Sequence, residues 1–116
     1  MRILVTGGAG FIGKALIIKL LSNPQNKIYN IDKLTYASDL NEIDNYIKLN
    51  NLTNYKFLKV DLSNKLETQE ALKIANPDSI IHLAAESHVD RSITNPFIFI
   101  KSNIIGTFNL LETALL

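Results

Sequence analysis

Apolar and polar positions along the chain predict strands and helices in regular alternation. Short apolar runs of strand length occupy residues 2–6, 27–32, 55–60 and 79–84. Longer stretches with helical spacing of apolar residues lie between and after them, at residues 11–22, 40–50, 64–75 and from 95 onwards. This alternation predicts an α/β protein with a parallel sheet and right-handed crossovers.

Polar residues at the expected helix ends agree with these boundaries. Ser63 is a candidate N-cap for the third helix, and Pro77 closes that helix off. Asn95 and Pro96 suit the N-cap and first residue of the last helix, after a long loop. Gly106 lies inside that helix, where it costs about 1 kcal/mol relative to alanine, so we expect close packing there.

Four of the five glycines of the chain crowd into the turn between the first strand and the first helix. Gly7 allows a sharp exit from the strand, Gly10 lets the backbone approach phosphates, and Gly13 lets the helix lie close to the strand. The helix that begins at Phe11 offers unbonded N–H groups and a partial positive charge to an anion. The turn predicts a Rossmann-type, doubly wound parallel sheet of strand order 3-2-1-4, with a dinucleotide between strands one and four.

Two alternatives to a dinucleotide turn were weighed. A strand-to-helix turn that merely needs small residues is the plainer one. A P-loop is excluded because Ala15 stands where the phosphate cradle requires Ser or Thr, and because the glycine spacing is too short.

Asp32 ends the second predicted strand, 19 residues after Gly13, close to where a carboxylate receives the adenosine ribose hydroxyls. A carboxylate accepts hydrogen bonds from both hydroxyls and repels a 2′-phosphate, so Asp32 favours NAD over NADP. Lys33 next to it weakens that preference slightly. An acid that only ends the strand in a turn is the alternative interpretation.

Composition limits the classes of function. With 116 residues, 47% of them hydrophobic, the chain has the size and core-forming capacity of a single domain. A net charge of +1 gives no support to binding of nucleic acid or an anionic membrane. The lack of cysteine excludes disulfides, a thiolate nucleophile and a cysteine metal site, and is compatible with a cytoplasmic protein. The apolar stretch 97–116 carries Lys101 and Glu112, so it indicates a buried helix and no membrane span.

The end of the chain lies inside a predicted helix that lacks a stop signal such as a glycine cap or a proline. The fourth strand has an apolar run suited to neighbours on both sides, although it would be a sheet edge here. We therefore expect residues 1–116 to be the N-terminal part of a nucleotide-binding domain in a longer protein.

Three motifs carry a resemblance to a known family. They are T-G-G-A-G-F-I-G at residues 6–13, D-K-L-T-Y-A at 32–37 and H-L-A-A-E-S-H-V-D-R-S at 82–92. Together they closely resemble the dTDP-glucose 4,6-dehydratases, extended short-chain dehydrogenases/reductases of nucleotide-sugar metabolism. The resemblance covers essentially the whole chain. Sugar-nucleotide epimerases are similar in the first motif but depart at the last one.

The resemblance implies an NAD-dependent lyase that acts on dTDP-glucose. The sugar is oxidised at C4, water is lost across C5–C6, and the hydride returns to C6, which yields a 4-keto-6-deoxy sugar nucleotide. The cofactor stays bound throughout, so the site must keep it away from water. A homodimer is implied as well, through a helix pair that includes the last helix of this chain.

The resemblance also assigns residues to roles. The pyrophosphate, ribose, adenine and remaining cofactor contacts are implied for Gly7, Gly10, Phe11, Ile12, Gly13, Asp32, Lys33, Leu34, Thr35, Asp61, Leu62, Leu83, Ala84, Ala85 and Ser102. Ser87 is the implied first contact with the sugar nucleotide. Ser102 replaces the usual threonine but keeps its hydroxyl.

Several of these residues have plainer interpretations that stay open. Asp61 could only cap the following turn. His82 is expected to be a packed core histidine, and His88 a loop residue without further metal ligands. Glu86 and Asp90 could shape the site or simply pair with Arg91.

The resemblance implies that the groups that would act on the sugar lie further along than this chain. No Tyr-x-x-x-Lys pair and no Asp-Glu pair follow the fourth strand, and Tyr36 has Leu40 where a lysine would be needed. We expect no catalytic residue, no metal site and no activity in the 116-residue piece. The sugar-nucleotide domain is also outside it. Another nucleotide-sugar epimerase or decarboxylase, or a non-catalytic nucleotide-binding module, are the alternatives.

Overall fold

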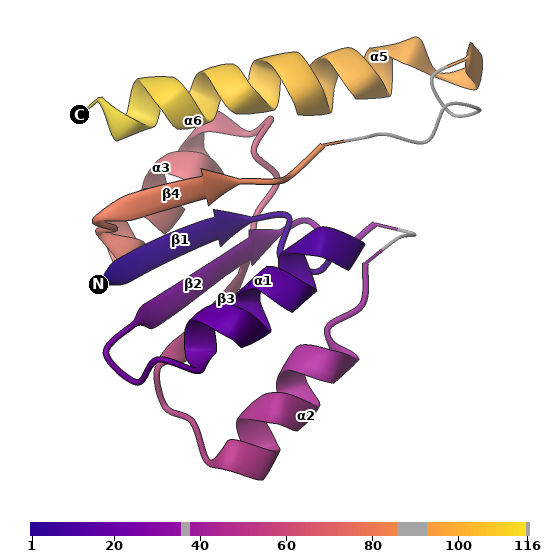
Figure 1. Cartoon of the computed structure of the whole chain (residues 1–116). Coiled ribbons are helices and arrows are strands. Elements are labelled where there is room, and N and C mark those ends of the chain that lie inside the picture. The colour runs from indigo at the N-terminus through magenta and orange to yellow at the C-terminus, as the bar shows by residue number, and fades with distance from the viewer. Residues whose placement is uncertain (36–37, 86–92, 116) are drawn as a thin grey trace.

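A four-stranded parallel sheet forms the centre of the molecule (Figure 1). The computed structural model describes residues 1–35, 38–85 and 93–115. The strands are β1 (Arg2–Thr6), β2 (Lys27–Asp32), β3 (Tyr55–Lys59) and β4 (Ser79–His82). They pair in parallel in the order β3-β2-β1-β4, which confirms the predicted order 3-2-1-4.

Helices cover both faces of the sheet (Figure 1). One layer holds α1 (Phe11–Leu21) and α2 (Asn41–Asn50). The other holds α3 (Lys65–Ala75) and a C-terminal helical segment. That segment is composed of α5 (Pro96–Phe99), a π-helix η1 (Ile100–Ile105) and α6 (Gly106–Ala114). Among the described residues, no helix is long and apolar enough to cross a bilayer.

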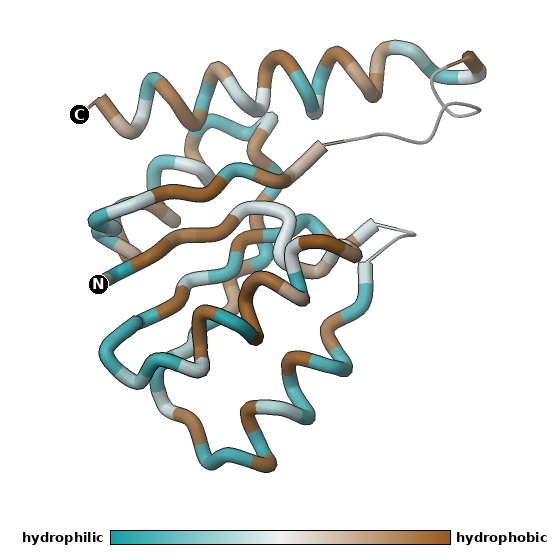
Figure 2. The backbone as a smooth tube through the Cα atoms, viewed as in Figure 1, coloured by the Kyte–Doolittle hydropathy of each residue, from teal (hydrophilic) through white to brown (hydrophobic). Residues whose placement is uncertain are grey.

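Alternation along the central strand divides the core between the two layers. Ile3 and Val5 belong to the apolar cluster that also contains Ile17 of α1. Leu4 points to the opposite face and joins the cluster with Leu72 of α3 and Leu110 of α6. Successive side chains of a strand face opposite sides, so a strand buried on both faces is apolar throughout. Figure 2 shows this as an unbroken hydrophobic stretch along β1.

The start of α3 differs from the prediction. Asn64, and not Ser63, is the N-cap, because its side-chain oxygen accepts a hydrogen bond from Glu67 N at 3.1 Å. Ser63 instead donates from its hydroxyl to Asp61 Oδ1 at 2.7 Å. The expected Ser63 cap was wrong because Asp61, two residues earlier, offers the serine a charged acceptor.

The fourth strand is shorter than the predicted 79–84, since the ladder with β1 ends at the pair Thr6 and His82. Beyond this pair β1 turns away at Gly7, so the next residues have no partner strand. Leu83 N donates to Thr6 O at 3.0 Å, and Ala84 N donates to the Thr6 hydroxyl oxygen at 3.1 Å. The Thr6 side chain therefore takes over from the backbone of β1 at Ala84.

The last helix is not uniform. A single α-helix was expected from residue 95 onwards, whereas residues Ile100–Ile105 adopt the wider π-helical turn. Gly106 follows directly, and a Cβ built on it would lie 3.3 Å from Leu62 Cβ. The close packing predicted for this glycine is thus confirmed. Apolar spacing does not distinguish the two helix types, and π turns occur often at functional sites.

Candidate functional site

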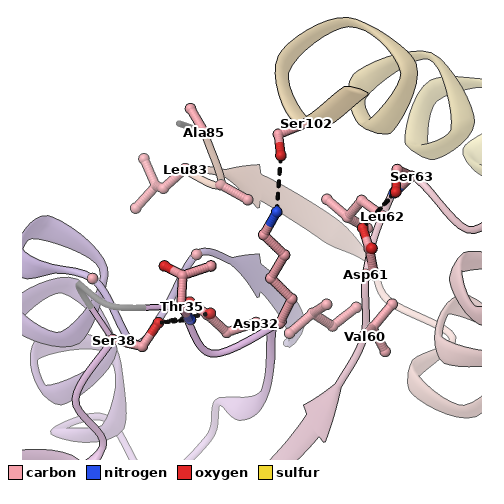
Figure 3. Close-up of a pocket in the computed structure, with 15 residues that line it drawn as sticks. Asp32, Thr35, Ser38, Val60, Asp61, Leu62, Ser63, Leu83, Ala85 and Ser102 are labelled. Carbon is pink, nitrogen blue, oxygen red and sulfur yellow. Dashed lines mark hydrogen bonds between the residues drawn. The ribbon is translucent and has the colours of Figure 1, made fainter. Parts of the chain in front are cut away.

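A pocket opens at the carboxyl ends of the strands, where the strand order reverses between β1 and β4 (Figure 3). This is the place at which open α/β sheets bind ligands. Its lining comprises Gly7, Gly10, Ile31, Asp32, Lys33, Thr35, Ser38, Val60, Asp61, Leu62, Ser63, Leu83, Ala84, Ala85 and Ser102.

Gly7 brings the exit of β1 into contact with the segment after β4. Its φ of +74° is in the left-handed region that glycine adopts without strain. A Cβ built on Gly7 would lie 2.7 Å from Ala84 N and 2.8 Å from the carbonyl carbon of Leu83. No side chain fits there, so two walls of the pocket meet backbone to backbone. The predicted sharp exit is confirmed.

The glycine turn places the N-terminus of α1 at the pocket. Gly10 is the N-cap, and Lys14 N donates to Gly10 O at 3.0 Å. The N–H groups of Phe11, Ile12 and Gly13 precede this first helical bond and are available to an anion. The side chains of Phe11 and Ile12 are exposed, so any role of these two residues here rests on the backbone.

Gly10 and Gly13 differ in what surrounds them. A Cβ built on Gly10 would make one tight contact, 3.3 Å to Gly7 O, with no second heavy atom within 4 Å. A Cβ on Gly13 would collide with Gly7 O and lie 2.7 Å from Gly8 Cα. The close approach predicted for Gly13 is confirmed, although the backbone that it approaches belongs to the glycine turn and not to the strand.

The Asp32 carboxylate organises the rim of the pocket. Its Oδ2 accepts from Ala9 N at 3.1 Å, and its Oδ1 accepts from Leu34 N at 2.8 Å. The Ser38 hydroxyl donates to Oδ1 at 3.2 Å and accepts from Thr35 N at 2.8 Å. Asp32 therefore joins the glycine turn to the loop after β2. Leu34 has a φ of +61°, which aims its N–H back at the carboxylate.

Lys33 reaches across the pocket. Its Nζ donates to Ser102 Oγ of η1 at 3.0 Å, which joins the end of β2 to the C-terminal helical segment (Figure 3). The hydroxyl that Ser102 keeps in place of the usual threonine thus lies at the pocket, and its contact with a cofactor stays a prediction. The lysine also adds positive charge to the site, as the sequence indicated.

Asp61 holds the turn that follows it and also lines the pocket, while its contact with adenine stays a prediction. It lines the pocket, and its Oδ1 accepts from both the N–H and the hydroxyl of Ser63, at 3.0 and 2.7 Å. Burial by itself would raise the pKa of Asp61, but the bonds from Ser63, with Lys33 and Lys101 nearby, lower the pKa below its ordinary value. The carboxylate is therefore ionised and available as an acceptor at neutral pH.

Most residues that the resemblance assigned to the cofactor meet in this one pocket. Those that line it are Gly7, Gly10, Asp32, Lys33, Thr35, Asp61, Leu62, Leu83, Ala84, Ala85 and Ser102. Phe11, Ile12, Gly13 and Leu34 lie beside it and are not part of its lining. Ser87 lies outside the described residues, as do Glu86, His88, Asp90, Arg91 and Tyr36.

Sequence reasoning missed four lining residues, Ile31, Ser38, Val60 and Ser63. Ile31 and Val60 directly precede the predicted Asp32 and Asp61, so the ends of their strands were a usable signal. Ser38 had none, because only the folded loop brings its hydroxyl to Asp32. Thr6 was also missed, although its hydroxyl holds the segment after β4.

Two Tyr-x-x-x-Lys spacings do occur before the fourth strand, at Tyr29/Lys33 and Tyr55/Lys59. Neither forms a reactive pair in the structure. The Tyr29 hydroxyl accepts from Arg2 at 2.9 Å, whereas Lys33 bonds Ser102 in the pocket. The Tyr55 hydroxyl accepts from the buried Asn30 at 3.1 Å, and Lys59 does not line the pocket. Among the described residues, no cluster of three or more His, Cys, Asp or Glu side chains could hold a metal ion.

A comparison of the sequence with protein-family models identifies the family of this chain. The model described as GDP-mannose 4,6 dehydratase matches residues 4–115. The chain belongs to this family. Within it, the chain is 47% identical to a dTDP-glucose 4,6-dehydratase from Salmonella typhimurium over 98% of its own length. The resemblance drawn from the three sequence motifs is thereby confirmed.

Solved structures agree on the fold of this GDP-mannose 4,6 dehydratase family member. A dTDP-glucose 4,6-dehydratase double mutant from Streptomyces venezuelae with NAD bound is 37% identical, with a TM-score of 0.82 over 98% of this chain and 35% of its own. A UDP-Glc/GlcNAc 4-epimerase from Campylobacter jejuni is 30% identical, with a TM-score of 0.85 over 97% and 33%. The chain spans about a third, 31%, of the length of the curated Salmonella relative.

Proposed function

We propose that this chain is the NAD-binding part of a nucleotide-sugar dehydratase that converts dTDP-glucose to dTDP-4-keto-6-deoxy-glucose. The observation that carries the proposal is the pocket at the switch point of the sheet, with the α1 N-terminus and the Asp32 carboxylate on its rim. The relatives named dTDP-glucose 4,6-dehydratase support the choice of substrate.

The shape and chemistry of the pocket suit NAD. Gly10 leaves room for phosphate oxygens, and the N–H groups of Phe11 and Ile12 would hold the pyrophosphate. Asp32 would accept from the adenosine ribose hydroxyls, and its negative charge disfavours a 2′-phosphate. The ionised Asp61 would accept from the adenine amino group, with Leu62 against the ring.

The far end of the pocket would receive the nicotinamide half of the cofactor. Leu83, Ala84 and Ala85 form an apolar wall after β4, and Ser102 faces them from η1 (Figure 3). When bound, NAD supplies a hydride acceptor that is regenerated within the cycle. The apolar wall would exclude water from that end of the site. We place the groups that act on the sugar beyond this chain, so the piece alone would be inactive.

An apolar stripe on the C-terminal helical segment supports the proposed homodimer. Ile104, Phe108 and Leu111 are each at least 60% exposed, and their four- and three-residue spacing places them on one helix face. An exposed stripe of this kind marks an interaction surface. Light scattering of the full-length protein tests this: Phe108→Glu should shift dimer to monomer, and a dimer of unchanged affinity would contradict the proposal.

The function is tested with the full-length protein in two steps. Isothermal titration should show NAD binding at least ten-fold tighter than NADP. Incubation with dTDP-glucose should then yield the 4-keto-6-deoxy product, detected by mass spectrometry as a loss of water. UDP-glucose is the matched control, because the structure shares its fold with a 4-epimerase that is as similar in shape. Epimerisation of UDP-glucose without dehydration of dTDP-glucose would overturn the proposed substrate and reaction. NAD binding without turnover of either sugar nucleotide would favour a non-catalytic binding module.

A further inference from the structure

A chain of hydrogen bonds runs behind the pocket, from β1 through β4 to the C-terminal helical segment. The Thr6 hydroxyl oxygen lies 2.6 Å from His82 Nδ1. His82 Nε2 lies 2.9 Å from the Thr107 hydroxyl oxygen. That hydroxyl donates to Asn103 O at 2.8 Å. His82, which the sequence predicts to be a packed core histidine, is thus half-buried, and both of its ring nitrogens are hydrogen-bonded.

The partners of Thr6 and Thr107 determine where the protons lie. The Thr6 hydroxyl oxygen accepts from Ala84 N at 3.1 Å, and it shares the Leu83 N–H, at 3.1 Å, with Thr6 O at 3.0 Å. At the other ring nitrogen, the Thr107 hydroxyl gives its hydrogen to Asn103 O, so its oxygen is left to accept from His82 Nε2. The Thr6 hydrogen then remains for His82 Nδ1. Nδ1 must then be unprotonated, and Nε2 carries the ring proton that is donated to Thr107. Every donor in this series of hydrogen bonds meets an acceptor only when His82 is this neutral tautomer.

A charged His82 would break this pattern. Its Nδ1–H would point at the Thr6 oxygen, whose acceptor sites are already used. Burial lowers the pKa of His82, which acts in the same direction.

The two ends of the chain of bonds adjoin two walls of the pocket. Leu83 and Ala84 form the wall after β4, and both are held by Thr6. Asn103 follows Ser102, which faces them from η1. We propose that His82, as the neutral Nε2–H tautomer, is a positioning residue that sets the spacing between these two walls. The cofactor part of this inference rests on the proposed NAD function.

The tautomer is tested without any cofactor. Nitrogen NMR of ¹⁵N-histidine-labelled full-length protein should show His82 with an unprotonated Nδ1 and a protonated Nε2. The His82 signals are assigned by their loss in the His82→Gln variant. The opposite tautomer, or a charged ring at neutral pH, would overturn the proposal whatever ligand the pocket binds.

The positioning role is tested with a matched pair at Thr107, which is partly exposed. Thr107→Val removes the acceptor for Nε2–H and should weaken NAD binding about five-fold, as expected for one lost hydrogen bond. Thr107→Ser keeps the acceptor, so its NAD affinity should stay within about two-fold of that of the wild type.

His82→Gln and His82→Leu form a second matched pair, because the glutamine amide has both an acceptor and a donor and leucine has neither. Equal NAD affinity within both pairs, with only thermal stability changed, would mean a purely structural role. If the wild-type protein binds no NAD, both the proposed function and the positioning role of His82 are contradicted. The tautomer of His82 is measured without NAD, so that result is independent of this outcome.

Discussion

Asp32 Oδ2 accepts a hydrogen bond from Ala9 N at 3.1 Å, which ties the end of β2 to the glycine turn after β1. The same carboxylate holds the next loop through Leu34 N and the Ser38 hydroxyl. A carboxylate has about four acceptor sites, so capacity remains for a ribose hydroxyl. One side chain thus has a structural role at the rim of the pocket and, in the proposed function, a binding role as well.

Substitution of Asp32 should separate these roles. Asp32→Asn keeps an acceptor for the loop but loses the charge, so we expect a weaker preference for NAD over NADP at a modest cost in stability. Asp32→Ala loses both and should lower NAD affinity at least ten-fold and the melting temperature as well. Titration calorimetry and thermal unfolding of the full-length protein measure the two effects. Glu70→Gln removes an exposed carboxylate outside the pocket and should change neither.

Gly10 and Gly13 should respond differently to alanine. Gly13→Ala places a methyl group against the backbone of Gly7 and Gly8, so we expect a loss of about 1–3 kcal/mol in the free energy of unfolding. Gly10→Ala brings its methyl group against a single backbone atom, Gly7 O at 3.3 Å, so it should destabilise folding less than Gly13→Ala while NAD affinity falls. Urea denaturation and calorimetry on both variants check this. Equal destabilisation by the two changes would contradict the geometry of the turn.

Asn109 should matter for stability although it does not itself line the pocket. It is 5% exposed on α6, and its Nδ2 donates to Leu62 O at 2.9 Å. Asn109→Ala leaves part of a buried hydrogen-bond network unmade and should cost about 1–3 kcal/mol in urea denaturation. Asn50 donates to Tyr46 O at the same distance but is exposed, so Asn50→Ala should stay within about 0.5 kcal/mol.

Asp61 should make stability depend on pH in the acid range. Because its pKa in the folded state lies below the ordinary 3.8, the ionised group contributes stability that is present above that value. This contribution is lost as the pH falls through the folded pKa. Ser63→Ala removes a donor to Asp61, so its pKa should rise in a ¹³C NMR titration and the stability difference from wild type should shrink in acid. In an Asp61→Asn background, Ser63→Ala should show no such pH dependence.

Much of the fold and most of the pocket could be predicted from local patterns. Apolar runs and the glycine turn indicated four parallel strands in the observed order. Asp32 and Asp61 were recognisable because strand-terminal acids at parallel carboxyl ends meet at one edge. The boundaries were less predictable. Ser63 was a plausible cap by type, but Asn64 caps α3 because Asp61 already holds the serine.

The amino-acid sequence by itself determined the alternation of strands and helices, the glycine turn and the acids at the ends of β2 and β3, since each depends on residue type and short spacing. Only the tertiary structure decided which polar groups meet across long separations. Thr6 meets His82 and Ala84, Lys33 meets Ser102, and Asn109 meets Leu62. These contacts depend on how β4 pairs with β1 and on how the C-terminal helical segment packs beside α3 and the strand ends, and hydrogen bonds between such distant residues leave no periodic signal in the sequence.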